Sequence, residues 1–122
     1  MKIDWKLKNG DEIVIDEVDK DAKFEDNLIY YVDEYGTHVI DRINKIYERR
    51  CPEDIFKVDF NNNLLTVIFE NNNLKYDINT KYEEENNKIT LTYSLGDEIK
   101  VIEITRKEEI WKIYYQKKLK RH

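Results

Sequence analysis

The chain is poor in the residues that cross-link, bend or anchor a protein. Its 122 residues include one cysteine, one proline and three glycines. A lone cysteine cannot form an internal disulfide, and the first residues contain no apolar run of the kind that a secretion signal or a membrane span requires. We therefore expect a cytoplasmic protein that folds without disulfides and does not interact with membranes.

Few residues are available for metal binding or nucleotide binding. The only histidines are His38 and His122, and the single cysteine stands alone, so the clustered ligands of a transition-metal site are missing. Each of the three glycines stands in an expected turn, so no glycine-rich phosphate loop can be written. The run Glu83-Glu84-Glu85 lacks the glycine-containing loop of a calcium site, and we interpret it as a solvated turn. We expect no metal and no cofactor.

The best local arrangement for catalysis is Cys51 beside Arg49 and Arg50, since nearby guanidinium groups favour the reactive thiolate. Neighbours in a strand point to opposite faces, however, so only Arg49 shares a face with Cys51. The chain offers a single serine, Ser94, and no recognisable catalytic base next to it. We interpret Cys51 as an ordinary, partly buried thiol and expect a protein that is not an enzyme.

The charge balance disfavours nucleic acid as a partner. The chain carries 26 acidic and 21 basic residues, a net charge of −5, and a body of that sign repels a phosphate backbone. Basic residues gather only at the C-terminus. The chain is also 40% hydrophobic, which is too apolar for a disordered protein.

Apolar and polar side chains alternate along most of the chain, which places them on opposite faces of β-strands. Near the N-terminus, Ile3, Trp5 and Leu7 alternate with charged residues, and Asn9-Gly10 then favours a tight hairpin turn. Further strands are expected over residues 12–18, 24–32 and 37–43. In the strand expected over residues 24–32, Leu28, Tyr30 and Val32 share a face.

Residues 44–54 are the least regular part of this half. Pro52 cannot donate a ladder hydrogen bond and biases Cys51 toward an extended conformation. We predict an edge strand that ends in a loop.

Asparagine-rich turns divide the second half into strands. Turns are expected at residues 61–63, 71–73, 86–87 and 96–97. Between them, two strands alternate between apolar and polar side chains, and residues 91–95 and 98–105 form a hairpin. The apolar positions are Leu74, Tyr76, Ile78 and Tyr82 in one strand, and Ile89, Leu91, Tyr93 and Leu95 in the other.

The C-terminal tail, residues 107–122, fits two structures. Trp111, Tyr115 and Leu119 recur at helical spacing, while Trp111, Ile113 and Tyr115 also alternate as in a strand. Acidic residues at the start and basic residues at the end suit a helix dipole. We therefore predict a short C-terminal helix.

The whole pattern predicts an all-β fold with about eight to ten antiparallel strands in up-and-down order. Closing such a sheet into a small barrel removes both exposed edges. A two-sheet sandwich is the alternative that the same alternation allows. We expect residues 1–122 to form one barrel domain, with residues 107–122 as its tail.

Part of the sequence resembles a known family. The run LKYDINTKYEEENNKITLTYSLGDEIKVIEI, residues 74–104, is similar to the closing strands of the YwiB-like family, bacterial domains of unknown function with a calycin-like barrel. The segment KFEDNLIYYVDEYG resembles the first hairpin of that family more loosely. The resemblance implies a lipocalin-type barrel, and calycins often hold a small apolar ligand inside. It assigns no site residues.

Two functions remain open. The barrel could bind a small apolar or amphipathic ligand, since inward tyrosines can line an amphipathic pocket; the same residues could instead simply fill the core. The alternative is a domain with a filled core that binds a protein partner through a sheet edge or through the basic, aromatic tail that includes Trp111, Tyr114 and Tyr115. The candidate ligand-binding residues are Trp5, Tyr30, Tyr76, Tyr82 and Tyr93.

Overall fold

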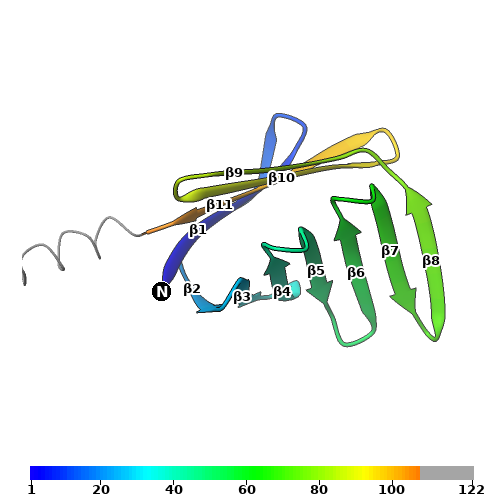
Figure 1. Ribbon diagram of the computed structural model, residues 1–122, viewed down its shortest axis with the longest axis horizontal. Helices are drawn as coiled ribbons and strands as arrows, with labels where there is room; N and C mark the ends of the chain where they lie inside the picture. Colours follow the sequence, from blue (N-terminus) through cyan, green and yellow to red (C-terminus); the bar gives the residue numbers. More distant parts are fainter. Residues whose placement is uncertain (108–122) are drawn as a thin grey trace, which may run out of the picture.

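A computed structural model describes residues 1–107, and every regular element in this range is a β-strand (Figure 1). The C-terminal helix predicted from the sequence lies outside the described residues. The strands are β1 (Lys2–Asn9), β2 (Glu12–Glu25), β3 (Leu28–Asp33), β4 (Gly36–Asp41), β5 (Ile46–Arg50), β6 (Asp54–Asp59), β7 (Leu64–Phe69), β8 (Asn72–Asp77), β9 (Thr80–Glu85), β10 (Lys88–Leu95) and β11 (Glu98–Arg106). In this part of the chain, no helix has the length and apolar character needed to cross a membrane.

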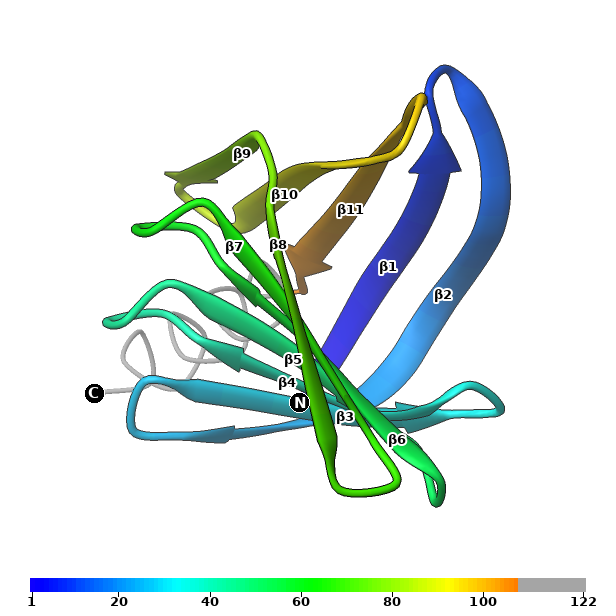
Figure 2. The same cartoon turned by 90° about the vertical axis from the view of Figure 1, so that its right-hand side faces the viewer.

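All eleven strands belong to one antiparallel sheet, in the order β8-β7-β6-β5-β4-β3-β2-β1-β11-β10-β9. The sheet curls into a half-barrel, which confirms the all-β, up-and-down fold predicted from the sequence (Figure 2). The strand and the loop predicted within residues 44–54 are present, but the edge position is wrong, because β5 pairs with β4 on one side and β6 on the other. Pro52 lies in the connection after β5, where its missing N–H costs no ladder hydrogen bond.

Strand β2 bends and joins the two parts of the curled sheet. Its first part pairs with β1, and only Ala22–Glu25 pairs with β3. A register irregularity between the pairs of Ile3 and Trp5 marks the bend. There Asp19 has a φ of 57°, and its backbone N–H donates to Asp4 Oδ1 at 2.9 Å. Such a bulge increases the local twist, and here it redirects the sheet (Figure 2).

At the β9 end of the sheet, side-chain contacts take the place of a backbone hydrogen-bond ladder. Strand β9 pairs only with β10, yet it contacts the turns of the opposite strands. Arg42, in the turn after β4, donates to Glu84 with an Nη2–Oε2 distance of 2.6 Å. The Thr80 hydroxyl lies 2.6 Å from Asn63 Oδ1, in the turn before β7. These contacts cap the edge of β9.

The core lies between the two parts of the sheet. Burial of apolar side chains in this core is the main contribution that stabilises the fold, at about 25 cal/mol per Å² of apolar surface removed from water. Half-buried apolar side chains such as Leu7, Ile15 and Val67 pack around the core, where the two parts diverge. The fully packed residues are Ile3, Trp5, Ala22, Ile29, Tyr31, Ile40, Tyr47, Val58, Phe60, Leu65, Ile89, Leu91, Tyr93, Ile102 and Ile104.

Candidate functional site: a polar cluster at the end of the core

The strand register brings a set of polar side chains together on the inner face of the sheet. Tyr31 on β3 is opposite His38 on β4, and His38 is opposite Arg49 on β5. Asp33 lies two residues beyond Tyr31 on the same face of β3. We refer to Tyr31, Asp33, His38, Tyr47 and Arg49 as the polar cluster.

His38 is the centre of this cluster and is 2% exposed. Its Nε2 lies 2.9 Å from Asp33 Oδ1, and its Nδ1 lies 2.7 Å from the Tyr47 hydroxyl. Burial lowers the pKa of His38 more than hydrogen bonding to Asp33 raises it, so the ring is neutral at neutral pH. A carboxylate only accepts hydrogen bonds, so Nε2–H donates to Asp33 and the Tyr47 O–H donates to Nδ1. Both ring nitrogens are thereby satisfied.

Aromatic rings pack around the histidine. The ring of Tyr31 stacks on His38 with centroids 4.5 Å apart and planes 6° apart. Trp5 contacts both rings, and its Nε1–H donates to Glu17 Oε2 at 3.0 Å. Burial raises the pKa of Tyr31 well above its ordinary value, so its hydroxyl stays protonated. The stack fixes the orientation of the imidazole ring.

Four buried polar atoms in this region have no hydrogen-bond partner among residues 1–107. They are Tyr31 Oη, Asp33 Oδ2, Arg49 Nε and Asp54 Oδ1. Buried polar groups in native proteins are nearly always paired, with protein or with ordered water, so an unpaired group calls for a partner. Asp54 is the first residue of β6, three residues after Cys51. The backbone N–H of Cys51 donates to the carbonyl oxygen of Asp54 at 2.9 Å.

Arg49 and Asp54 line a cavity of about 410 Å³ together with Tyr35, Cys51, Pro52 and Glu53. Among residues 1–107, no carboxylate forms an ion pair with Arg49; its guanidinium lies over the ring of Phe56, 5.2 Å from the centroid. Phe56 in turn contacts Tyr93 of β10, with centroids 5.8 Å apart. The Arg49 side chain thus reaches from the cavity toward the core.

Cys51 lines this cavity together with Arg49. Its Sγ–H donates to the Tyr35 carbonyl oxygen at 2.9 Å. Burial and the negative charge of the nearby Asp54 raise the pKa of the thiol, and the opposing effect of Arg49 is smaller. The protonated thiol is a poor nucleophile, in agreement with the interpretation of Cys51 as an ordinary thiol.

The five tyrosine and tryptophan positions singled out from the sequence lie in different environments. Trp5 and Tyr93 are buried, at 2% and 6% exposure. Tyr82 is half-buried and makes an edge contact with Phe60. Tyr76 is opposite Leu65, on the inner face, but it is 49% exposed because β8 ends the sheet.

The inward position expected for Tyr30 is wrong. Tyr31 and Ile29 face the core, and Tyr30 points to the other face, opposite Val39. The stretch from Leu28 to Val32 is apolar at both phases of the alternation, so the sequence could not distinguish them. The sequence pattern also did not identify His38 as a residue of the core. A signal was present, since His38 lies two residues before Ile40, and such residues share a face of a strand.

No group of three or more histidine, cysteine or acidic side chains with metal-binding geometry occurs within residues 1–107. Comparison with family models, with curated proteins and with solved structures gave no match. The resemblance to the YwiB-like family therefore stays a prediction.

Proposed function

We propose that the protein binds a small amphipathic molecule whose polar head group occupies the cavity at Arg49 and Asp54. The observation that carries this proposal is the pair of unpaired buried atoms, Arg49 Nε and Asp54 Oδ1, beside a cavity of about 410 Å³. One is a hydrogen-bond donor and the other is an acceptor. A head group that offers both, such as a carboxamide, matches them.

The surroundings favour an apolar body for the ligand. Arg49, Phe56, Val67 and Leu74 follow one another across β5, β6, β7 and β8 on the inner face. Val67 is half-buried and Leu74 is 47% exposed, so this row leads from the cavity to open apolar surface. A short alkyl chain that covers this row would gain about 0.8 kcal/mol for each buried methylene group.

This proposal refines the ligand-binding hypothesis from the sequence. The aromatic residues expected to line a pocket, Trp5 and Tyr93, pack in the core, and the proposed ligand lies next to them instead of among them. The lipocalin-type barrel implied by the YwiB-like resemblance is compatible with such a carrier. No covalent chemistry is part of the proposal.

The test is a titration, by calorimetry and native mass spectrometry, with octanamide, octanoate and octylamine. Octanamide offers an acceptor and a donor, octanoate only acceptors and octylamine only donors. We expect saturable one-to-one binding that is tightest for octanamide. Arg49→Met keeps an unbranched, apolar stem and removes the hydrogen-bond donors of the guanidinium group. It should weaken octanamide binding about 10- to 100-fold, the effect of losing a hydrogen bond to a charged group.

Arg50→Met is the matched control. Arg50 is the next residue, is exposed and forms an ion pair with Glu48 at 2.7 Å, away from the cavity. Its substitution should leave the affinity unchanged. Absence of saturable binding by the folded wild type, or equal affinities for Arg49→Met and the wild type, would refute the proposal.

A further inference from the structure

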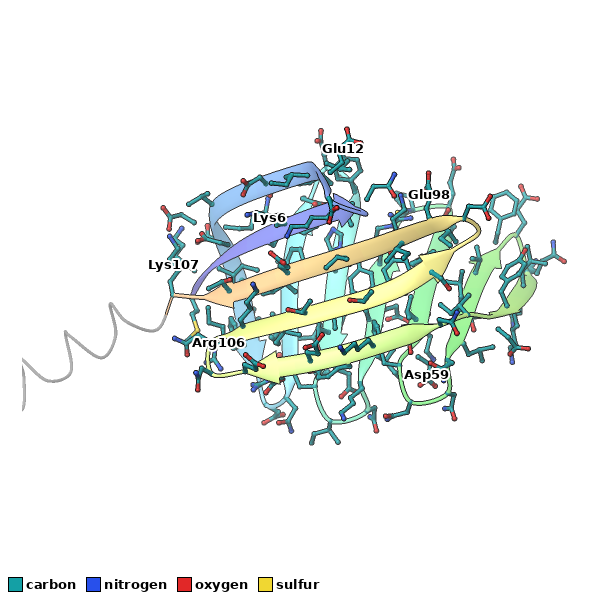
Figure 3. The ribbon with its side chains drawn as sticks, turned by 90° about the horizontal axis from the view of Figure 1, so that it is seen from above. Lys6, Glu12, Asp59, Glu98, Arg106 and Lys107 are labelled. Atoms are coloured by element: carbon teal, nitrogen blue, oxygen red, sulfur yellow. The ribbon has the colours of Figure 1, made fainter. Side chains whose placement is uncertain are left out.

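The first part of β2 has an unpaired edge. Residues 12–20 pair with β1 on one side, while β3 pairs with β2 only from Ala22 onward. No other strand of the described chain covers this stretch. In Figure 3, β2 forms the margin of the upper layer, with Glu12 near the tip of its hairpin and Lys107 at the opposite end. We call residues 12–20 the open edge of β2.

The open edge continues into a large cleft. A cavity of about 950 Å³ lies where β2 and β3 separate, lined by residues 17–23 of β2 and residues 30–32 of β3. Apolar side chains are exposed along both: Val18 at 63% and Val32 at 61% beside the cleft, and Ile13 and Val14 at 51% and 56% on the edge itself. An edge with exposed apolar side chains is a template for an added strand.

The charges of the open edge determine what kind of strand fits. Glu12, Asp16, Glu17 and Asp19 are acidic, and Lys20 is the only basic residue. Glu17 and Asp19 already form ion pairs with Lys20 and Lys107, at 3.3 and 2.8 Å. Within residues 1–107, no ion pair involves Glu12 or Asp16. A second copy of this edge would bring like charges together, which is unfavourable across paired strands.

We infer that the open edge of β2 binds an extended peptide segment whose basic residues lie at one end and whose apolar residues lie at the other. Backbone hydrogen bonds to β2 continue the sheet. Asp16 and Val18 are two residues apart on one face of β2, so the segment changes from basic to apolar along its length. Its basic end lies beside Glu12 and Asp16, and its apolar end covers Val18 and Val32. This site is separate from the cavity at Arg49, so it does not depend on the proposed ligand.

The other free edges are less suitable. Strand β9 is capped by the turns that carry Arg42 and Asn63. Strand β8 is exposed along its whole length, but it is shorter and its charged residues, Lys75 and Asp77, have opposite signs. A basic segment therefore has the stronger electrostatic match at β2.

The experiment uses the full chain and a short peptide with lysine residues in one half and valine residues in the other. Fluorescence anisotropy measures its affinity, and hydrogen exchange with mass spectrometry locates it. We expect saturable binding, slower exchange of backbone amides in residues 12–20, and weaker binding at high salt. The same peptide with alternate backbone nitrogens methylated cannot pair along the edge, and should not bind.

The double variant Glu12→Lys, Asp16→Lys should weaken binding at least about tenfold while its melting temperature changes little, since both side chains are exposed. Asp77→Lys on β8 is the matched charge reversal at a different edge, and should bind as the wild type does. Three results would overturn the inference: no saturable binding, equal binding of the methylated peptide, or a loss of affinity and exchange protection at β8 instead of β2.

Discussion

Two tyrosines next to His38 allow the hydrogen bonding in the core to be tested by one chemical change made at two sites. Tyr31 and Tyr47 are 2% and 3% exposed, and each ring lies against the histidine, with centroids 4.5 and 5.9 Å away. The Tyr47 hydroxyl lies 2.7 Å from His38 Nδ1, whereas the buried Tyr31 hydroxyl has no partner in the described part of the chain. Replacing either by phenylalanine keeps the ring and removes only the hydroxyl.

The two substitutions should change the free energy of unfolding in opposite directions. Tyr47→Phe leaves Nδ1 of a buried imidazole unpaired, which costs about 1–3 kcal/mol. Tyr31→Phe removes a hydroxyl that is desolvated in the folded protein and hydrated in the unfolded chain, so it should be neutral or stabilise the protein by up to about 1 kcal/mol. The expected difference between the variants is therefore about 2 kcal/mol.

Urea unfolding followed by circular dichroism measures this difference, provided that both variants unfold with the same dependence on urea. Equal losses of stability would refute the reasoning, and so would a larger loss for Tyr31→Phe than for Tyr47→Phe. The second result would mean that the Tyr31 hydroxyl has a partner, such as a buried water molecule. The double variant would then show how far the two hydroxyl groups depend on each other.

Three further predictions concern the histidine, two glycines and one ion pair. Because burial lowers the pKa of His38, the unfolded chain binds its proton more readily, and stability should fall as the pH drops below about 6.5; unfolding at several pH values should show a flatter dependence for His38→Gln. Gly36→Ala should lower the free energy of unfolding by more than about 2 kcal/mol, because the new Cβ would lie 2.5 Å from a backbone oxygen. Gly96→Ala, with a φ of 63° but no atom within 4 Å, should lower it by about 1 kcal/mol. Thermal unfolding compares the two variants. Glu84→Gln removes the charge that faces Arg42 and should cost about 0.5–1 kcal/mol at low salt and less in molar salt, which a salt series of unfolding curves would show.

Most strands were predictable because their signal is local, but the single strand expected over residues 74–82 is wrong: this stretch contains the end of β8 and the start of β9, at opposite ends of the sheet. Alternation along residues 2–8 and 88–95 gives β1 and β10, and asparagine favours the turns, where Asn63, Asn71 and Asn86 adopt positive φ values. Where both phases of the alternation are apolar, as from Leu28 to Val32, local information does not choose a face, and the core residue is Tyr31 and not Tyr30.

The amino-acid sequence by itself determined that this chain forms an antiparallel, up-and-down β-sheet, since side-chain alternation and turn chemistry act within a few residues. Only the tertiary structure decided what that sheet encloses and what it leaves open. The contacts of His38 with Asp33 and Tyr47, and the unpaired atoms of Arg49 and Asp54, depend on the register between separate strands. The open edge of β2 depends on the bend at Asp19, where β2 pairs with one strand before the bend and with another after it.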